Sequence, residues 1–462
     1  MPPSTMPPKG TRDLLPGEAR RRQYITRIIE AAYEAHGFEP LMTPSIETLD
    51  TLLGKYGQEG DQLIFKILKR GESLQRAMAG KGEIGEGDLA DLGLRYDLTV
   101  PLARVAAGSQ NALPRPFKRY QIQQVWRADR PAKGRFREFT QCDVDIVGAA
   151  SICADAEVFS AAATALTGLG FSDVALMTNH RDVLFGLIEA AGIDPALEGS
   201  ALVAVDKLDK IGWGGVTKEL KERGLSEACV DRLRALLDVD AASNAATLDH
   251  LEAALKDSAR GQKGVRELRE ILSLTAASPA GPLVRISPYI ARGLSYYTGL
   301  IVEAVTPQLA GSIGAGGRYD GLVGMFLGRD LPAVGFSLGL DRLEVVMEAL
   351  GLFPARLDGA PEVMVAAMGD PVGDMALAAA LRGQGLRVDV CVEPDARLGK
   401  QFKAADGRGI RFVAIQGSEE RAQGQVAIKD LLTGHQQSMG RDTVAAAIAA
   451  TLRGPSDGAE GA

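Results

Sequence analysis

The spacing of apolar residues predicts a helix followed by a strand near the start of the chain. Between Glu18 and His36 the apolar positions recur at the interval of an amphipathic helix, and Gly37 ends the pattern. Residues 38–43 then alternate as a short strand would, up to Pro44. Helix, strand and proline in this order are common, so they indicate no function by themselves.

Further along, residues 80–93 are rich in glycine and acidic side chains, which predicts a loop. Residues 94–107 follow as a strand that turns into a helix. From about residue 184 to 280 the pattern changes to helices with charged faces.

Beyond a linker at residues 352–361, strand and helix patterns alternate up to residue 452. Strands are expected at 363–368, 387–392, 410–415 and 426–428, and helices at 374–382, 400–406 and 443–452. Alternation of this kind predicts a separate α/β domain with some antiparallel edge.

Composition limits the classes of protein to consider. The chain has 462 residues, enough for two or three domains, and its 46% hydrophobic and 24% charged content is ordinary for a soluble protein. No run of 18 apolar residues predicts a membrane span, and the first residues lack the apolar segment of a secretory signal. The four cysteines form no CxxC pair, so neither a zinc ribbon nor a disulfide framework is expected. A cytoplasmic protein without a membrane partner is therefore expected.

A local basic run stands out against the net charge of −7. Eight basic residues and one acid, Asp129, lie between Arg115 and Arg137. Such a run is usually a solvated face. Here it alternates with apolar residues, which indicates a strand that carries Arg127 toward one face and favours an anion-binding site.

Four segments in a fixed order carry a family resemblance. They are FKRYQIQQVWRADRPAKGRFREFTQCDVDIVG (117–148), RGLSYYTG (292–299), GAGGRYDGLV (314–323) and GFSLGLDRLEVVME (335–348). Together they resemble the class II aminoacyl-tRNA synthetases, and specifically the histidyl-tRNA synthetase family. Ser295 stands where that family commonly has Asp, which puts one supporting hydrogen bond in doubt. The third segment lacks a complete GxGxxG, so a dinucleotide-binding fingerprint is rejected, and its glycines are expected to let backbone approach a ligand closely.

The resemblance implies a fold and a domain order. The fold class is α/β (α+β): a class II catalytic domain with an antiparallel sheet and helices, a helical insertion, and a C-terminal α/β anticodon-binding domain. The expected boundaries are 1–183 for the first catalytic part, 184–280 for the insertion, 281–352 for the second catalytic part and 361–453 for the anticodon-binding domain. The family's motif 1, matched by the first helix and strand, implies a homodimer.

The resemblance also implies site residues for activation of histidine by ATP. Alignment of two anions needs arginines rather than a general base, because the attacking carboxylate is already ionised. The catalytic residues implied are Arg127, Arg292 and Gln141. The implied ATP contacts are Arg127, Asp129, Arg292 and Arg342. The implied histidine contacts are Asp97, Thr99, Arg127, Gln141, Asp145, Arg292, Tyr296, Tyr297 and Tyr319. No protein metal site is expected, and Mg²⁺ is expected to enter with ATP.

The implied function is a histidine–tRNA ligase with L-histidine, ATP and tRNA(His) as substrates. Two other classes of protein are alternatives. A noncatalytic paralogue that binds histidine on the same fold, as a regulatory subunit of ATP phosphoribosyltransferase does, typically loses motif residues that are present here. A synthetase for proline, threonine or glycine would not be expected to carry the 292–299 segment. Asp143 and Asp145 could also be turn acids at a strand end.

Overall fold

The computed structural model describes residues 4–453, apart from 56, 80–83, 133, 238, 240–242, 292–296, 355–356, 358–360 and 394. The chain divides into two compact units, Met1–Phe353 and Pro354–Ala462. The first three expected ranges lie within the first unit and the fourth within the second. Among the described residues, none of the helices is both long and apolar enough to cross a membrane.

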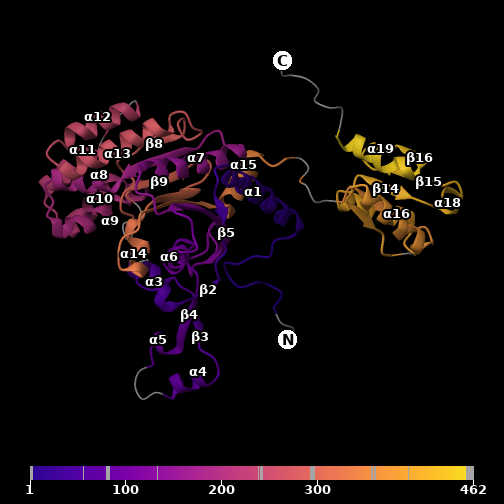
Figure 1. Ribbon diagram of the computed structural model, residues 1–462, viewed down its shortest axis with the longest axis horizontal. Helices are drawn as coiled ribbons and strands as arrows, with labels where there is room; N and C mark the ends of the chain where they lie inside the picture. The colour runs from indigo at the N-terminus through magenta and orange to yellow at the C-terminus, as the bar shows by residue number, and fades with distance from the viewer. Residues whose placement is uncertain are drawn as a thin grey trace. The chain divides into compact units, whose positions relative to one another are not determined.

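An eight-stranded sheet forms the centre of the first unit (Figure 1). Neighbouring strands are antiparallel, except for the parallel pairs at the two edges, β1 with β5 and β7 with β8. In spatial order the strands are β1 (Glu39–Pro40), β5 (Phe117–Trp126), β6 (Glu138–Val147), β11 (Ala333–Gly339), β10 (Gly314–Arg318), β9 (Leu300–Val305), β7 (Ala175–His180) and β8 (Val284–Ile286). The strand expected over residues 38–43 is thus reduced to two residues at the sheet edge.

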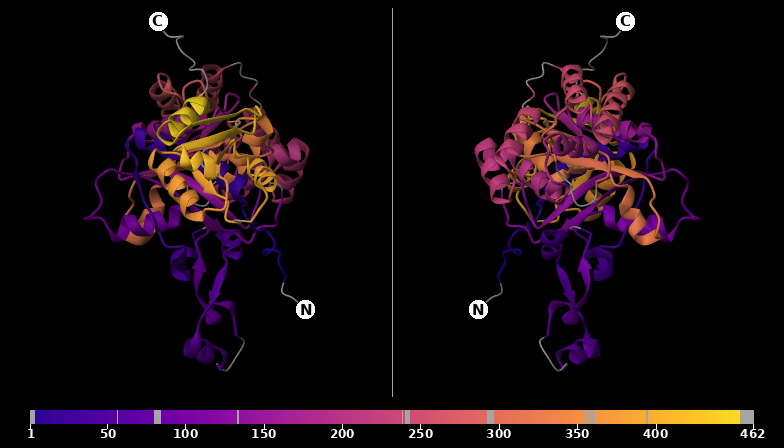
Figure 2. Two further views of the ribbon diagram at one scale, coloured as in Figure 1. Left: turned by 90° about the vertical axis from the view of Figure 1, so that its right-hand side faces the viewer. Right: turned by 90° about the vertical axis from the view of Figure 1, so that its left-hand side faces the viewer.

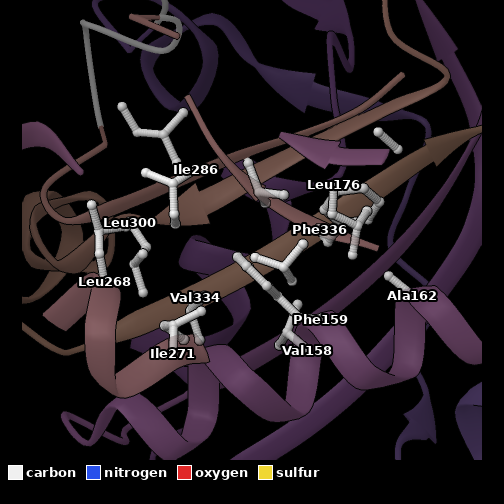
Figure 3. Close-up of a cluster of buried hydrophobic side chains, with 14 of the residues drawn as sticks. Val158, Phe159, Ala162, Leu176, Leu268, Ile271, Ile286, Leu300, Val334 and Phe336 are labelled. Carbon is white, nitrogen blue, oxygen red and sulfur yellow. The ribbon is translucent and has the colours of Figure 1, made fainter. Parts of the chain in front are cut away.

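Helices cover one face of this sheet. The expected first helix is confirmed as α1 (Pro16–Ala35), which packs on α7 (Ile152–Gly168). Figure 3 shows side chains of α7 and α13 (Ala259–Thr275) meeting apolar side chains of β7, β8, β9 and β11, among them Phe159, Ile271 and Phe336. The opposite face carries buried polar side chains and, where Phe117, Val147 and Ala333 lie, a smaller apolar cluster.

The region expected to be helical is helical. It contains α8 (Arg181–Ala190), the 3-10 helix η1 (Pro195–Leu197), α9 (Glu198–Val205), α10 (Leu208–Glu222), α11 (Glu227–Leu237), α12 (Asn244–Ala254) and α13. Helix α8 packs against α13, and α13 also contacts α7. Outside that region this unit also contains α2 (Leu49–Leu52), α3 (Gly57–Gln62), α6 (Thr99–Gly108) and α14 (Asp320–Leu327).

A small three-stranded sheet, of order β2-β4-β3, projects from the first unit (Figures 1 and 2). It consists of β2 (Ile46–Thr48), β3 (Lys66–Leu68) and β4 (Ala90–Leu94), with α4 (Gly71–Met78) and α5 (Glu86–Leu89) at its far end. The expectation of a loop through residue 93 was therefore wrong for its second half. Gly93 belongs to a strand, paired with Glu47 on β2 and Lys66 on β3, and a Cβ there would lie only 3.0–3.1 Å from Leu52 and Ile64.

The second unit is an α/β domain with a five-stranded sheet of order β13-β12-β14-β15-β16. Its elements are β12 (Val363–Val365), α16 (Pro371–Gly383), β13 (Val388–Val390), α17 (Leu398–Gly407), β14 (Phe412–Ile415), α18 (Ser418–Ala422), β15 (Gln425–Asp430), β16 (Gln436–Gly440) and α19 (Arg441–Arg453). The three strands at one side are parallel and the last two pair antiparallel, which confirms the expected mixed pattern.

Candidate active site

A cleft of about 350 Å³ opens on the polar face of the large sheet. Its floor is formed by β6, β10 and β11, and its rim by the start of α6, the 134–139 segment and the start of α15 (Leu340–Leu350). The lining residues are Asp97, Thr99, Arg127, Asp129, Gly134, Arg135, Phe136, Phe139, Gln141, Asp143, Asp145, Tyr297, Ser312, Ile313, Gly314, Ala315, Gly316, Tyr319, Gly335, Phe336, Ser337, Gly339, Asp341 and Arg342.

Strand β6 supplies one wall through its alternation. Gln141, Asp143 and Asp145 line the cleft, whereas Cys142 and Val144 between them belong to the core. The Gln141 side-chain amide donates a 2.8 Å hydrogen bond to the Ser337 hydroxyl on β11. Its carbonyl oxygen Oε1 and Asp143 Oδ1 are buried and have no hydrogen-bond partner among the described residues. Such atoms are costly unless a ligand pairs with them.

A fully buried arginine lies behind this wall. Arg119, on β5, is directly opposite Asp145, with 2.9 Å between its NH2 and Asp145 Oδ2 and 3.7 Å to Asp143 Oδ2. Burial raises the pKa of Asp143 to about 7, although Arg119 acts in the opposite direction. Burial likewise raises the pKa of Asp145, again against the effect of Arg119. A single guanidinium thus faces two carboxylates. Ionising both carboxylates would therefore destabilise the fold.

Tyr319 and Gly335 fix the position of the Asp145 carboxylate. The Tyr319 hydroxyl donates to Asp145 Oδ1, and burial raises the pKa of this tyrosine well above its usual range. Gly335 is the residue opposite Asp145 on β11, and a Cβ there would lie 1.9 Å from Asp145 Oδ1. Only glycine leaves room for the carboxylate in this place.

Arg127 lies at the other end of the cleft, immediately after β5. Its Nε donates a 3.0 Å hydrogen bond to the Tyr96 carbonyl, and its guanidinium lies 4.1 Å from the Tyr96 ring centroid and 5.2 Å from that of Phe139. Two aromatic faces therefore hold a permanent cation at the cleft surface. Asp129 pairs with Arg135 at 3.3 Å across the turn that follows.

The start of α15 contributes Arg342, whose NH1 donates to the Ser312 carbonyl. The neighbouring Asp341 accepts from the Thr140 backbone at 3.0 Å and pairs with Arg22 at 2.7 Å. These contacts tie the first turn of α15 to β6 and α1. The backbone that carries Arg342 is therefore held in place at the rim of the cleft.

Asp97 and Thr99 stand where β4 has ended and α6 begins. Asp97 Oδ1 accepts a 3.0 Å hydrogen bond from the Val100 backbone amide, as an acidic residue at a helix start commonly does. Asp97 is buried, and both residues line the cleft. The helix start therefore holds the Asp97 carboxylate against the pocket.

Nine of the residues expected from the sequence line this one cleft: Asp97, Thr99, Arg127, Asp129, Gln141, Asp145, Tyr297, Tyr319 and Arg342. The other two, Arg292 and Tyr296, lie outside the described residues. The cleft is also lined by Asp143, Ser337 and Phe136, which were not predicted as site residues. Asp143 could have been found, because strict alternation over residues 141–146 puts it on the same face as Gln141 and Asp145.

Comparisons with known proteins bear on both units. A family model described as histidyl-tRNA synthetase matches residues 10–343, and one described as anticodon binding domain matches residues 362–451. A histidine–tRNA ligase of Gloeobacter violaceus is 42% identical over 468 residues, covering 96% of this chain and 98% of the relative. One from Christiangramia forsetii is 41% identical over 443 residues, covering 94% and 96%.

A solved structure agrees with this comparison. The crystal structure of histidyl-tRNA synthetase from Nostoc sp. PCC 7120 is similar to this chain with a TM-score of 0.82 and 31% identity, over 98% of this chain and 100% of that one. The match therefore extends over the catalytic cleft, the helical region and the C-terminal unit. With the cleft, both family models and near-complete relatives in agreement, the chain belongs to the histidyl-tRNA synthetase family.

Proposed function

We propose that this chain is a histidine–tRNA ligase, which activates L-histidine with ATP and transfers it to the 3′ end of tRNA(His). The support is the family membership together with a cleft that joins arginines at one end to buried acceptors at the other. The noncatalytic alternative would not need Arg127 and Arg342 at the same cleft.

In the first step the histidine carboxylate attacks the α-phosphorus of ATP, and pyrophosphate leaves with the electron pair of the broken P–O bond. The chain must align two anions and stabilise the charge that develops on the phosphoryl oxygens. We assign this role to Arg127, with Arg292 as a second contact to the reacting group, and the terminal phosphate to Arg342. Asp129 would lie near the adenine. In the second step a 3′-terminal ribose hydroxyl of tRNA attacks the adenylate carbonyl, and AMP leaves.

Recognition of the histidine side chain is assigned to the β6 wall. A neutral imidazole offers one N–H donor and one acceptor. Asp145 would accept from the ring, with Tyr296, Tyr297 and Tyr319 around it, while Asp97, Thr99 and Gln141 would hold the α-amino group. We add Asp143, because its buried Oδ1 faces the same cleft. Buried acceptors that only the correct ligand satisfies would reject apolar amino acids strongly.

Mg²⁺ is proposed to enter as part of the ATP complex rather than as a resident ion. In the parts of the chain that the structure describes, no group of three or more His, Cys, Asp or Glu side chains could hold a metal. Magnesium typically takes one or two carboxylates and fills its remaining positions with phosphate oxygens and water. The bound ion would neutralise charge on the phosphates.

The second unit is proposed to bind the anticodon arm of tRNA(His), and the chain to act in the cytoplasm, where that substrate is charged. A homodimer is also proposed. After α1, the side chains of Met42 and Ile46 are 79% and 48% exposed, as expected of residues that a partner covers. Light scattering on the full chain would give a dimer mass; a monomer at micromolar concentration would exclude it.

The observation that carries the proposal is the convergence of Arg127, Asp145 and Gln141 on one cleft. Exchange of labelled pyrophosphate into ATP tests it, with each amino acid supplied separately. Histidine alone is expected to support exchange. A noncatalytic histidine-binding protein would give none, and a synthetase of another specificity would respond to a different amino acid.

A further inference from the structure

The N-terminal residues 9–12 contact two separate parts of the cleft rim. The first is the segment from Pro131 to Arg137, which we call the rim loop. The Arg137 backbone amide donates a 2.7 Å hydrogen bond to the Gly10 carbonyl, and its NH1 donates to the Lys9 carbonyl at 3.4 Å. Arg137 Nε donates to the Asp129 carbonyl at 3.1 Å. Arg137 therefore connects the N-terminal segment to both ends of the turn beside the cleft.

Gly10 allows this contact to be close. Its φ is +88°, a backbone conformation that side-chain-bearing residues rarely adopt. A Cβ at this position would lie 2.8 Å from Arg137 Cγ and 3.0 Å from Pro131 Cγ. The N-terminal segment is thus fitted against both ends of the rim loop.

Arg12 makes the second contact, to the start of α15. Its NH2 donates to Asp341 Oδ1 and to Glu344 Oε2, both at 3.1 Å. The same guanidinium lies 4.4 Å from the centroid of the Phe136 ring, which belongs to the rim loop and lines the cleft. Both carboxylates are largely buried, at 7% side-chain exposure, so the ion pairs are poorly screened by water.

One side chain therefore joins the two rim elements proposed to enclose ATP. Asp341 precedes Arg342 in the first turn of α15, so a shift of Asp341 would move the base of the Arg342 side chain as well. Phe136 is held on the other side by stacking on the same guanidinium. An arginine suits this position because its planar group stacks and pairs at the same time.

We propose that residues 9–12 act as a strap across the cleft rim, with Arg12 as a positioning residue for the nucleotide. The strap holds the rim loop against the start of α15, so that Phe136 and Arg342 are in place when ATP binds. The histidine end of the cleft, built on β6 and β11, has none of these contacts. The inference rests on the proposed function and adds that the strap acts on ATP rather than on histidine.

The chain supplies a matched control for Arg12. Arg21 also pairs with a carboxylate of α15, Glu348, at 2.7 Å and also lies over an aromatic ring, 5.4 Å from the Phe353 centroid. Neither partner of Arg21 lines the cleft. Both R12M and R21M therefore remove an ion pair with α15 and a contact with an aromatic ring. Only R12M removes these contacts at the cleft.

Histidine-dependent pyrophosphate exchange in the full chain is measured with each substrate varied in turn. R12M is expected to raise KM for ATP about tenfold or more, while KM for histidine changes less than about threefold. R21M is expected to leave both constants within about twofold. Equal kinetics for the two variants, or equal rises of both KM values in R12M, would overturn the proposal.

Two further measurements keep the test decisive. If R12M melts below the assay temperature, G10A replaces it, since that change leaves every ion pair intact; an unchanged KM for ATP in G10A would refute the strap. Trypsin cleavage after the exposed Arg135 is expected to be faster in R12M than in R21M. This second readout needs no activity, so a wild type without histidine-dependent exchange would refute the proposed function and leave the strap to be judged by proteolysis.

Discussion

The sheets of the two units use their faces differently. In the second unit both faces are apolar: Val363, Val365 and Phe412 belong to one buried cluster, and Met364 and Val413, from the same strands, belong to another. The large sheet of the first unit has its main apolar cluster on one face, and on the other face only a smaller one around Phe117, Val147 and Ala333 at the end of the strands. On its other face Arg119, Gln121, Gln141, Asp143 and Asp145 are all buried.

The difference reflects two requirements, stability of the fold and binding of a substrate. Apolar residues on both faces stabilise a sheet without further conditions, whereas buried polar atoms without partners destabilise it. The first unit retains such atoms where a substrate could pair with them, which is the pattern expected of a binding cleft. The second unit fills both faces of its sheet with apolar side chains and is suited to binding through its surface.

The largest expected effect comes from Arg127. Arg127→Ala should lower histidine-dependent exchange by about a hundred- to thousandfold, because a cation aimed at the developing charge is lost. Thermal melting should change little, since Arg127 is partly exposed and the side-chain hydrogen bond it makes within the described residues goes to the Tyr96 carbonyl. Exchange rates and melting curves are the two measurements.

Arg411 is the matched control in the second unit, where it pairs with Asp430 at 2.9 Å. Arg411→Ala should weaken that unit and leave exchange unchanged. If both alanine variants lose exchange to the same extent, the division of roles between the sheets is wrong.

Gly335 tests the histidine end of the cleft. A methyl group in Gly335→Ala would occupy the place of the Asp145 carboxylate, 1.9 Å away, and displace it. KM for histidine should rise roughly ten- to a hundredfold, while KM for ATP changes less. Exchange at varied histidine concentration measures this.

Gly383→Ala is the corresponding change in the second unit, at the end of α16, where no atom lies within 4 Å of the added group. It should leave every constant unchanged and slightly stabilise its helix. A normal KM for histidine in Gly335→Ala would contradict the assignment of Asp145.

Removing the second unit should separate the two steps of the reaction. A chain that ends at Pro361 retains the whole first unit and the cleft. Pyrophosphate exchange should stay within about twofold of the full chain, whereas charging of tRNA(His) should fall about tenfold or more as anticodon contacts are lost. Equal charging by both chains would refute anticodon binding by this unit.

The sequence predicted much of this arrangement where periodicity is strong. Helix α1, the helical region that follows residue 184 and the alternating elements of the second unit follow directly from apolar spacing. Strand β4 did not, because its composition is that of a loop. It is a strand because it pairs with β2 and β3 on its two sides, and such tertiary pairing is reported by no local pattern.

The site was predicted by motif order rather than by periodicity, and this explains what was missed. Asp143 was not among the predicted site residues, because the family resemblance implied a role for Asp145 and none for Asp143. Its neighbour Arg119 was counted with a basic run, although it is fully buried behind Asp145. Whether a charged side chain is buried depends on the neighbouring strand. The pairing of β5 with β6 therefore has to be known before Arg119 can be connected with Asp143.

The smallest expected effect is on the pH dependence of the free energy of unfolding, which the buried carboxylates alter. Because the folded pKa of Asp143 is about 7 and its unfolded value is about 3.9, the folded state holds a proton that the unfolded chain releases. The stability associated with this proton is present below about pH 4 and is lost as the pH rises toward 7. Asp143→Asn has no such proton, so its free energy of unfolding relative to the wild type should rise by about 1–3 kcal/mol between pH 5 and 7 and then level off.

Tryptophan fluorescence during denaturation can follow this in the first unit alone, because the chain has two tryptophans, Trp126 and Trp213, and both lie there. Because the second unit contributes nothing to this signal, the stability of the first unit can be measured separately in the full chain. Parallel stability curves for wild type and Asp143→Asn over this range would mean that Asp143 is ionised in the fold. Arg119 would then neutralise both carboxylates, and the polar face would cost the first unit less than its burial implies.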